Sequence, residues 1–158
     1  MATILSPFAR GVANVAYASE AGCIAVNDFY VDLVTGDLLA NNIIDLGILP
    51  AGHTITDAIL MAGDLDTGTA MTMDIGIMSG NVGDSTSVRT VGTELFAAST
   101  AAQTGAIVRP TTRSALTIVA SPADRSIGVK IVAAPTGATA GRIVLRVLSH
   151  AVNSGFVL

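Results

Sequence analysis

Alternating apolar and polar residues predict a series of short β-strands along this chain. In residues 70–78, large apolar side chains occupy every second position, and Thr, Asp and Gly residues lie between them. A period of two residues is typical of a strand with one buried face. The same period returns in residues 126–133 and 142–149, and no long segment with a helical period separates these strands. The pattern therefore predicts an all-β protein.

Turn residues mark where the predicted strands end. The sequences TGD at 35–37 and PAG at 50–52 favour turns, because Gly tolerates positive φ and Pro fixes φ near −65°. The expected strands are 23–34, 43–49, 54–62, 70–78, 105–109, 114–120, 126–133 and 142–149. One short helix is expected at 94–102, with Thr93 as its N-cap. About eight closely spaced strands favour a jelly-roll-like antiparallel β-sandwich.

The composition indicates that this sandwich is part of a larger assembly. Of the 158 residues, 51% are hydrophobic and only 13% are charged, whereas globular domains carry about 25% charged residues. No segment reaches the roughly 20 apolar residues that a membrane-spanning helix needs. We therefore expect a homo-oligomer, or a subunit of a larger structure, that buries apolar surface against its neighbours and has no membrane partner.

Acidic and basic residues are concentrated in different halves of the chain. Residues 1–84 contain ten acidic residues and Arg10 as the one basic residue, which gives −9. Residues 85–158 contain seven basic residues, six of them Arg, and two acidic ones, which gives +5. These charges could pair within one chain or between neighbouring subunits, and the sequence leaves both alternatives open. Scattered basic residues, scarce aromatic residues and a net charge of −4 disfavour nucleic-acid binding.

The two ends of the chain differ from the region between them. Residues 1–22 have weak periodicity and are expected to form an extended N-terminal arm, and residues 23–158 to form the sandwich with an apolar C-terminal tail. Each end could lie on a neighbour or fold back on its own sandwich. The expected partner-binding residues come from the arm, the basic half and the tail: Ile4, Leu5, Phe8, Tyr17, Arg109, Arg113, Phe156, Val157 and Leu158.

Residues with catalytic or metal-binding chemistry are few. His53 and His150 lack metal-ligand spacing, and we expect both to be hydrogen-bonded or solvated surface residues. The sequence GDLDTG at 63–68 is expected to form an Asx-type turn, with a weak Ca²⁺ site as the alternative, shared by Asp64, Asp66 and either Asp74 or Asp84. Cys23 is expected to be a small buried residue. We predict a protein without catalytic residues, cofactor or metal.

One resemblance links these patterns to a known group of proteins. The segments LPAGHTITDAILM, GDLDTGTAMTMDIGIM, VGTELFAAST and RSIGVKIVAAPTGATAGRIVLRVL resemble the head decoration, or cement, proteins of tailed bacteriophages. The resemblance covers residues 46–149, about two-thirds of the chain. It implies a jelly-roll-like sandwich, no catalytic residues, and many copies that clamp the major capsid protein on the outside of the head. It also implies self-association as dimers or trimers.

The predicted function is therefore that of a capsid decoration protein of a bacteriophage virion. Its partners would be the major capsid protein and further copies of itself. Synthesis is expected in the reducing cytoplasm of the bacterial host, because Cys23 is the single cysteine and no disulfide can form within the chain. Residues 1–15 also lack the early positive charge and apolar block of a signal peptide. The alternatives are another virion component, such as a head–tail connector, tail or fibre protein, and a carbohydrate-binding sandwich.

Overall fold

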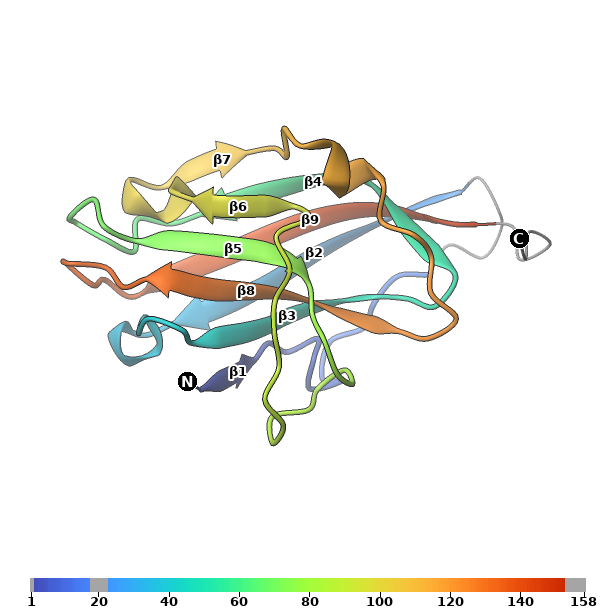
Figure 1. Ribbon diagram of the computed structural model, residues 1–158, viewed down its shortest axis with the longest axis horizontal. Helices are drawn as coiled ribbons and strands as arrows, with labels where there is room; N and C mark the ends of the chain where they lie inside the picture. Colours follow the sequence, from blue (N-terminus) through green and yellow to red (C-terminus); the bar gives the residue numbers. More distant parts are fainter. Residues whose placement is uncertain (1, 18–22, 153–158) are drawn as a thin grey trace.

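The computed structural model describes residues 2–17 and 23–152 and places nine strands of this part of the chain in two facing sheets (Figure 1). The five-stranded sheet has the order β1-β3-β8-β5-β6, and the four-stranded sheet has the order β2-β9-β4-β7. The strands are β1 (Thr3–Leu5), β2 (Ile24–Leu33), β3 (Ile43–Leu49), β4 (His53–Ala62), β5 (Thr72–Ile77), β6 (Phe96–Ser99), β7 (Ala106–Val108), β8 (Arg125–Ala133) and β9 (Gly141–Ala151). The all-β sandwich is confirmed.

Apolar side chains from both sheets fill the space between them. In β9, Ile143, Leu145 and Val147 are fully buried and alternate with more exposed residues, as the sequence period predicts. Strands β2 and β9 pair over ten residues, from Ile24↔His150 to Leu33↔Gly141. In the described part of the chain, no helix is long and apolar enough to cross a membrane.

The beginning of the chain folds back on its own sandwich. Strand β1 pairs in parallel with β3 and extends the five-stranded sheet at its edge. Phe8 then packs edge-on against Phe29 and Tyr30, with ring centroids 5.0 and 5.6 Å away. The backbone of Ala16 exchanges two hydrogen bonds with the Asn27 side chain in β2. The arm could lie on a neighbour or fold back on its own sandwich, and residues 2–17 fold back on their own sandwich.

Three local expectations are wrong. Residues 94–102 do not form a helix: they contain β6 and the start of a short 3-10 helix, η2 (Ala101–Gln103), because Phe96 completes the edge of a sheet by pairing with Ile75. Residues 114–120 do not form a strand: they overlap another 3-10 helix, η3 (Arg113–Leu116). Cys23 is exposed rather than buried, because it lies just before β2 at the end of the sandwich.

Candidate partner-binding surfaces

The outer face of the five-stranded sheet is covered by the chain itself. The connection between β5 and β6 crosses in front of β8 and β3 (Figure 1). From this connection, the fully buried Arg89 reaches Asp45 of β3, with 2.5 Å between Nη1 and Oδ2. The Ser126 hydroxyl of β8 and the Gly83 amide also donate to Asp45 Oδ2, at 2.9 and 3.1 Å. These contacts fix the connection on the sheet, so this face offers little free surface.

In the described part of the chain, the outer face of the four-stranded sheet is, in contrast, left open and carries many apolar side chains. Strand alternation and register place eight large apolar side chains there: Ile24, Val26, Tyr30, Ile59, Met61, Ile107, Val144 and Leu148. Ile24, Val26 and Ile107 are 55%, 51% and 74% exposed. The solvated face of an antiparallel sheet is usually polar, so an apolar one indicates a surface that contacts a partner.

Acidic and basic side chains on this face pair with one another. Arg146 binds Asp28 and Arg142 binds Asp32, each through two hydrogen bonds of 2.7–2.8 Å. The hydrogen bonds from Arg146 and Arg142 lower the pKa of Asp28 and of Asp32, respectively. Each pair joins an acidic residue of the first half to an Arg of the second.

Two further ion pairs follow the same rule. Arg109 Nη1 lies 3.0 Å from Asp57 Oδ2 near the β7 edge of the four-stranded sheet, and the buried Arg89–Asp45 pair lies on the other sheet. At these four places, the acidic residues of the first half of the chain therefore pair with basic residues of the second half within the same chain.

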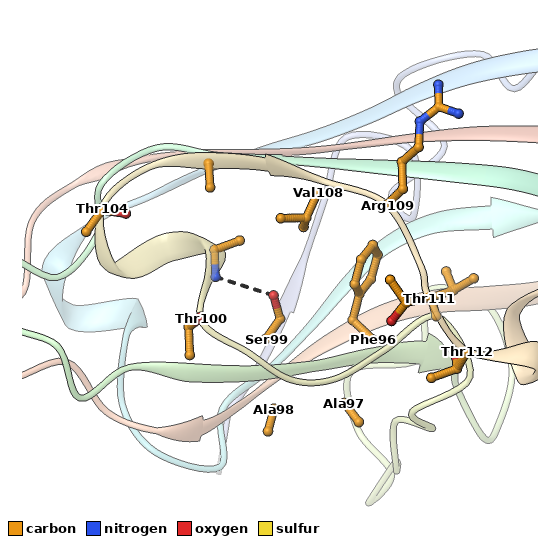
Figure 2. Close-up of a pocket in the computed structure, with 13 residues that line it drawn as sticks. Phe96, Ala97, Ala98, Ser99, Thr100, Thr104, Val108, Arg109, Thr111 and Thr112 are labelled. Atoms are coloured by element: carbon orange, nitrogen blue, oxygen red, sulfur yellow. Dashed lines mark hydrogen bonds between the residues drawn. The ribbon is translucent and has the colours of Figure 1, made fainter.

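A shallow groove of about 370 Å³ lies where the edge strands β6 and β7 meet (Figure 2). Phe96 and Val108 project into it, and Ser99 and Thr111 add hydroxyl groups. The Arg109 side chain points away from the groove (Figure 2), toward Asp57 on the outer face of the four-stranded sheet. The groove therefore lacks a convergent charged group and does not resemble a catalytic pocket.

The acidic turn at 63–68 has a structural role. Although burial opposes ionisation, backbone amides of Gly137, Met71, Ala70 and Gly68 donate to Asp66 and lower its pKa to about 2. These bonds join the turn to the β8–β9 connection. This is the expected Asx-type turn. In the described residues, no group of three or more His, Cys, Asp and Glu side chains is placed to hold a metal ion.

Each of the two histidines has one ring nitrogen at hydrogen-bond distance from an oxygen atom of the sandwich. His53 is buried, against expectation, because it begins β4 beneath the Tyr17 ring, 6.3 Å away. Its Nδ1 lies 2.9 Å from the Ala51 carbonyl oxygen. His150 lies on the outer face of β9, with Nδ1 2.9 Å from the Thr56 hydroxyl.

The predicted partner-binding residues are not brought together into one site. Ile4 packs partly buried against the core, Leu5 is half-buried, and Phe8 is a core residue. Tyr17 is 60% exposed and Arg113 is exposed. Arg109 lies in its ion pair at the edge of the open face. The tail residues lie outside the described part of the chain: Phe156, Val157 and Leu158.

Sequence reasoning missed the open face, although a signal was present. Val144 and Leu148 are apolar at positions of β9 that alternation assigns to solvent. Val26 has the same property in β2. Apolar residues on both faces of an antiparallel strand indicate that both faces are buried. In the described chain, only the inner faces of β2 and β9 are buried.

The comparisons with known proteins place this fold among phage capsids. No protein-family model and no curated protein matches the sequence. Among solved structures, a chain of the capsid of Ralstonia phage GP4 is 42% identical, with a TM-score of 0.91 over 97% of this chain and 100% of that one. A chain of the cyanophage Pam1 capsid asymmetric unit is 20% identical, with a TM-score of 0.66 over 90% of this chain and 96% of that one, which shows a shared fold.

Proposed function

This chain belongs to the same family as the Ralstonia phage GP4 capsid protein that it matches, and we propose that it is a decoration protein of a phage head. In this role it binds the outside of the shell and stabilises the lattice of the major capsid protein. The similarity to that capsid chain, which extends over nearly the whole length of both, carries the proposal. The order β2-β9-β4-β7 facing β3-β8-β5-β6 supports a jelly roll, the fold implied by the resemblance to phage decoration proteins.

The composition supports an accessory subunit held by many modest contacts. The four ion pairs described above are made inside the chain, so attachment to the shell relies on other groups, apolar and polar, at several places. Contacts that act together hold a subunit far more tightly than any one of them alone. Decoration thus needs no deep pocket and no reactive residue.

We assign the shell contact to exposed residues of the N-terminal segment and the η3 region, and to the apolar residues at the end of the sequence. Tyr17 and Arg113 are exposed in the folded chain and are free to meet a second surface. The tail residues Phe156, Val157 and Leu158 supply further apolar groups. Ile4, Leu5 and Phe8 serve the contact indirectly, because they hold the N-terminal segment on the sandwich.

A binding experiment with phage heads tests this proposal. Purified protein is added to heads that lack it, and the bound copies are counted after the heads are separated from free protein. We expect saturable binding of many copies per head. The Tyr17→Ala variant should bind more weakly, and the Leu39→Ser variant should bind normally, because Leu39 is equally exposed (59%) but follows β2 at the opposite end of the sandwich. Absence of binding by the unaltered protein contradicts the proposal.

A further inference from the structure

We propose that a second copy of this chain covers the open face of the four-stranded sheet, related to the first by a twofold axis parallel to the strands. The inference deepens the proposed function and rests on it for its biological setting, because a paired subunit offers the shell two sets of contacts instead of one. The argument starts from the apolar residues of this face, continues with its charges, and ends with their order across the sheet.

Apolar side chains form a continuous row across all four strands. Tyr30 of β2 is paired with Val144 of β9, Val144 with Met61 of β4, and Met61 with Ile107 of β7. A second apolar pair, Val26 and Leu148, lies on the far side of the Asp28–Arg146 ion pair from this row. Two sheets that pack face to face interdigitate such rows and exclude water between them. Burial of this row is worth about 25 cal/mol for each Å² removed from water.

The charged groups of the face would enter an interface as ion pairs and not as single charges. Asp28, Asp32 and Asp57 each have an Arg partner on the same face. An ion pair that is already formed carries no net charge into an interface, whereas an unpaired charge would be costly there. Two identical faces of this kind therefore approach without net repulsion.

The order of the charges across the sheet favours a second copy over an unrelated surface. In the order β2-β9-β4-β7, the signs alternate: acidic at Asp28, basic at Arg146, acidic at Asp57 and basic at Arg109, which follows β7. The four lie near one level, because Asp28 is paired with Arg146, and Asp57 is two positions from Ile59, the partner of Arg146.

A twofold axis parallel to the strands reverses this order in the second copy. Asp28 of one copy then faces Arg109 of the other, and Arg146 faces Asp57. Each of these four charges meets its opposite, so this part of the pattern is complementary to itself, and the Asp32–Arg142 pair remains within its own chain. Phe8 and Ala16 of the N-terminal segment cover the edge of β2. A second copy is therefore more easily accommodated on the face of this sheet than at its β2 edge.

The mass of the purified protein in solution tests the inference, because that measurement contains no phage heads. We expect twice the mass of the 15.9 kDa chain by sedimentation. The Ile107→Lys variant, which adds an unpaired charge at a 74% exposed position, should weaken the dimer at least about tenfold and keep its fold. Leu39→Lys is the matched control at an exposed position outside the face, and it should remain dimeric.

Cross-linking tests the geometry. In a Cys23→Ser background, one preparation carries Met61→Cys and another carries Val144→Cys. After mixing, a short bis-maleimide should join the two different variants, because the twofold axis puts these positions on facing strands.

Three results overturn the inference. They are a monomeric or trimeric unaltered protein, a dimer that Ile107→Lys leaves intact, and a dimer without the mixed cross-link. A monomer whose Ile107→Lys variant no longer binds heads would assign the open face to the shell instead. In each case the decoration function is judged separately, by head binding.

Discussion

Arg89 and Asp45 form an ion pair between two fully buried side chains that are 44 positions apart in the sequence. Arg89 Nε also donates to the Ser79 carbonyl oxygen at 2.8 Å. The Arg89 side chain therefore links the start of the β5–β6 connection, at Ser79, to its later part. The pair holds the β5–β6 connection against the five-stranded sheet. It is the reason that this sheet, unlike its partner, has a covered outer face.

Removing one member of this pair should destabilise the fold strongly. We expect Arg89→Met to lower the free energy of unfolding by about 3–5 kcal/mol, because it leaves the Asp45 carboxylate buried without its partner. The double variant Arg89→Met/Asp45→Leu should recover much of that loss. Denaturant unfolding measures both. A single variant as stable as the unaltered protein would show that the pair does not hold the connection.

The exposed ion pairs provide a contrast. Arg146→Met removes the partner of Asp28, whose side chain is 46% exposed. Because water solvates the remaining carboxylate in the single chain, and Arg109 of the second copy faces it in the proposed dimer, this change should affect the free energy of unfolding far less than Arg89→Met. Equal losses in the two variants would contradict the distinction between the covered face and the open face.

Gly47 is required by the close approach of the Phe29 ring. A Cβ atom at position 47 would overlap that ring, which is itself fully buried in the core. We expect Gly47→Ala to cost about 1–3 kcal/mol of stability through overpacking. Gly36→Ala is the matched control, because a Cβ atom at position 36 meets nothing within 4 Å. Thermal unfolding of the two variants measures the difference, and equal melting temperatures would contradict this packing.

Acid should weaken the turn at Asp66. The pKa of this carboxyl is about 2 in the folded chain, below its ordinary value of 3.8. The folded state therefore binds the proton less readily than the unfolded state, so the stabilisation is present above about pH 4 and is lost as the pH falls toward about 2. The Asp66→Asn variant should be less stable at neutral pH and should lose less stability over that interval. Unfolding curves recorded from pH 6 to pH 2 measure this, and parallel curves for both proteins would contradict it.

Phe8 and Tyr17 should separate stability from binding. Phe8→Ala removes a ring that is 7% exposed and should cost about 3–5 kcal/mol in the free energy of unfolding. Tyr17→Ala, at 60% exposure, should cost much less stability, because it uncovers only His53, and should weaken attachment to heads. Unfolding and head binding are measured for both variants. A Tyr17→Ala variant that binds heads normally would remove Tyr17 from the proposed contact.

Most strands were predictable from the sequence because their apolar period is strong. The predicted strand at 43–49 matches β3, and the strand at 126–133 differs from β8 by one residue. Residues 94–102 were misassigned because Ala-rich segments favour helices locally, whereas pairing with β5 prevails in the folded chain. Residues 114–120 were misassigned because the β-branched residues Thr117, Ile118 and Val119 favour a strand locally, whereas the folded chain forms η3 just before them.

The candidate surfaces were harder to predict than the fold. The sequence indicates that apolar surface must be covered, but the register between β2, β9, β4 and β7 decides which residues meet on one face. The buried pair left a weak signal: Asp45 interrupts an apolar strand without a nearby basic residue. Its partner Arg89 lies 44 positions away, and only the tertiary fold brings the two together.

A reconstruction of the phage head that contains this protein tests the central claim most directly. We predict many copies of the sandwich on the outer surface of the shell, each in contact with more than one major capsid subunit. The claim is contradicted if the sandwich lies inside the shell, forms the continuous shell itself, or occurs only in a ring of about a dozen copies at the tail vertex.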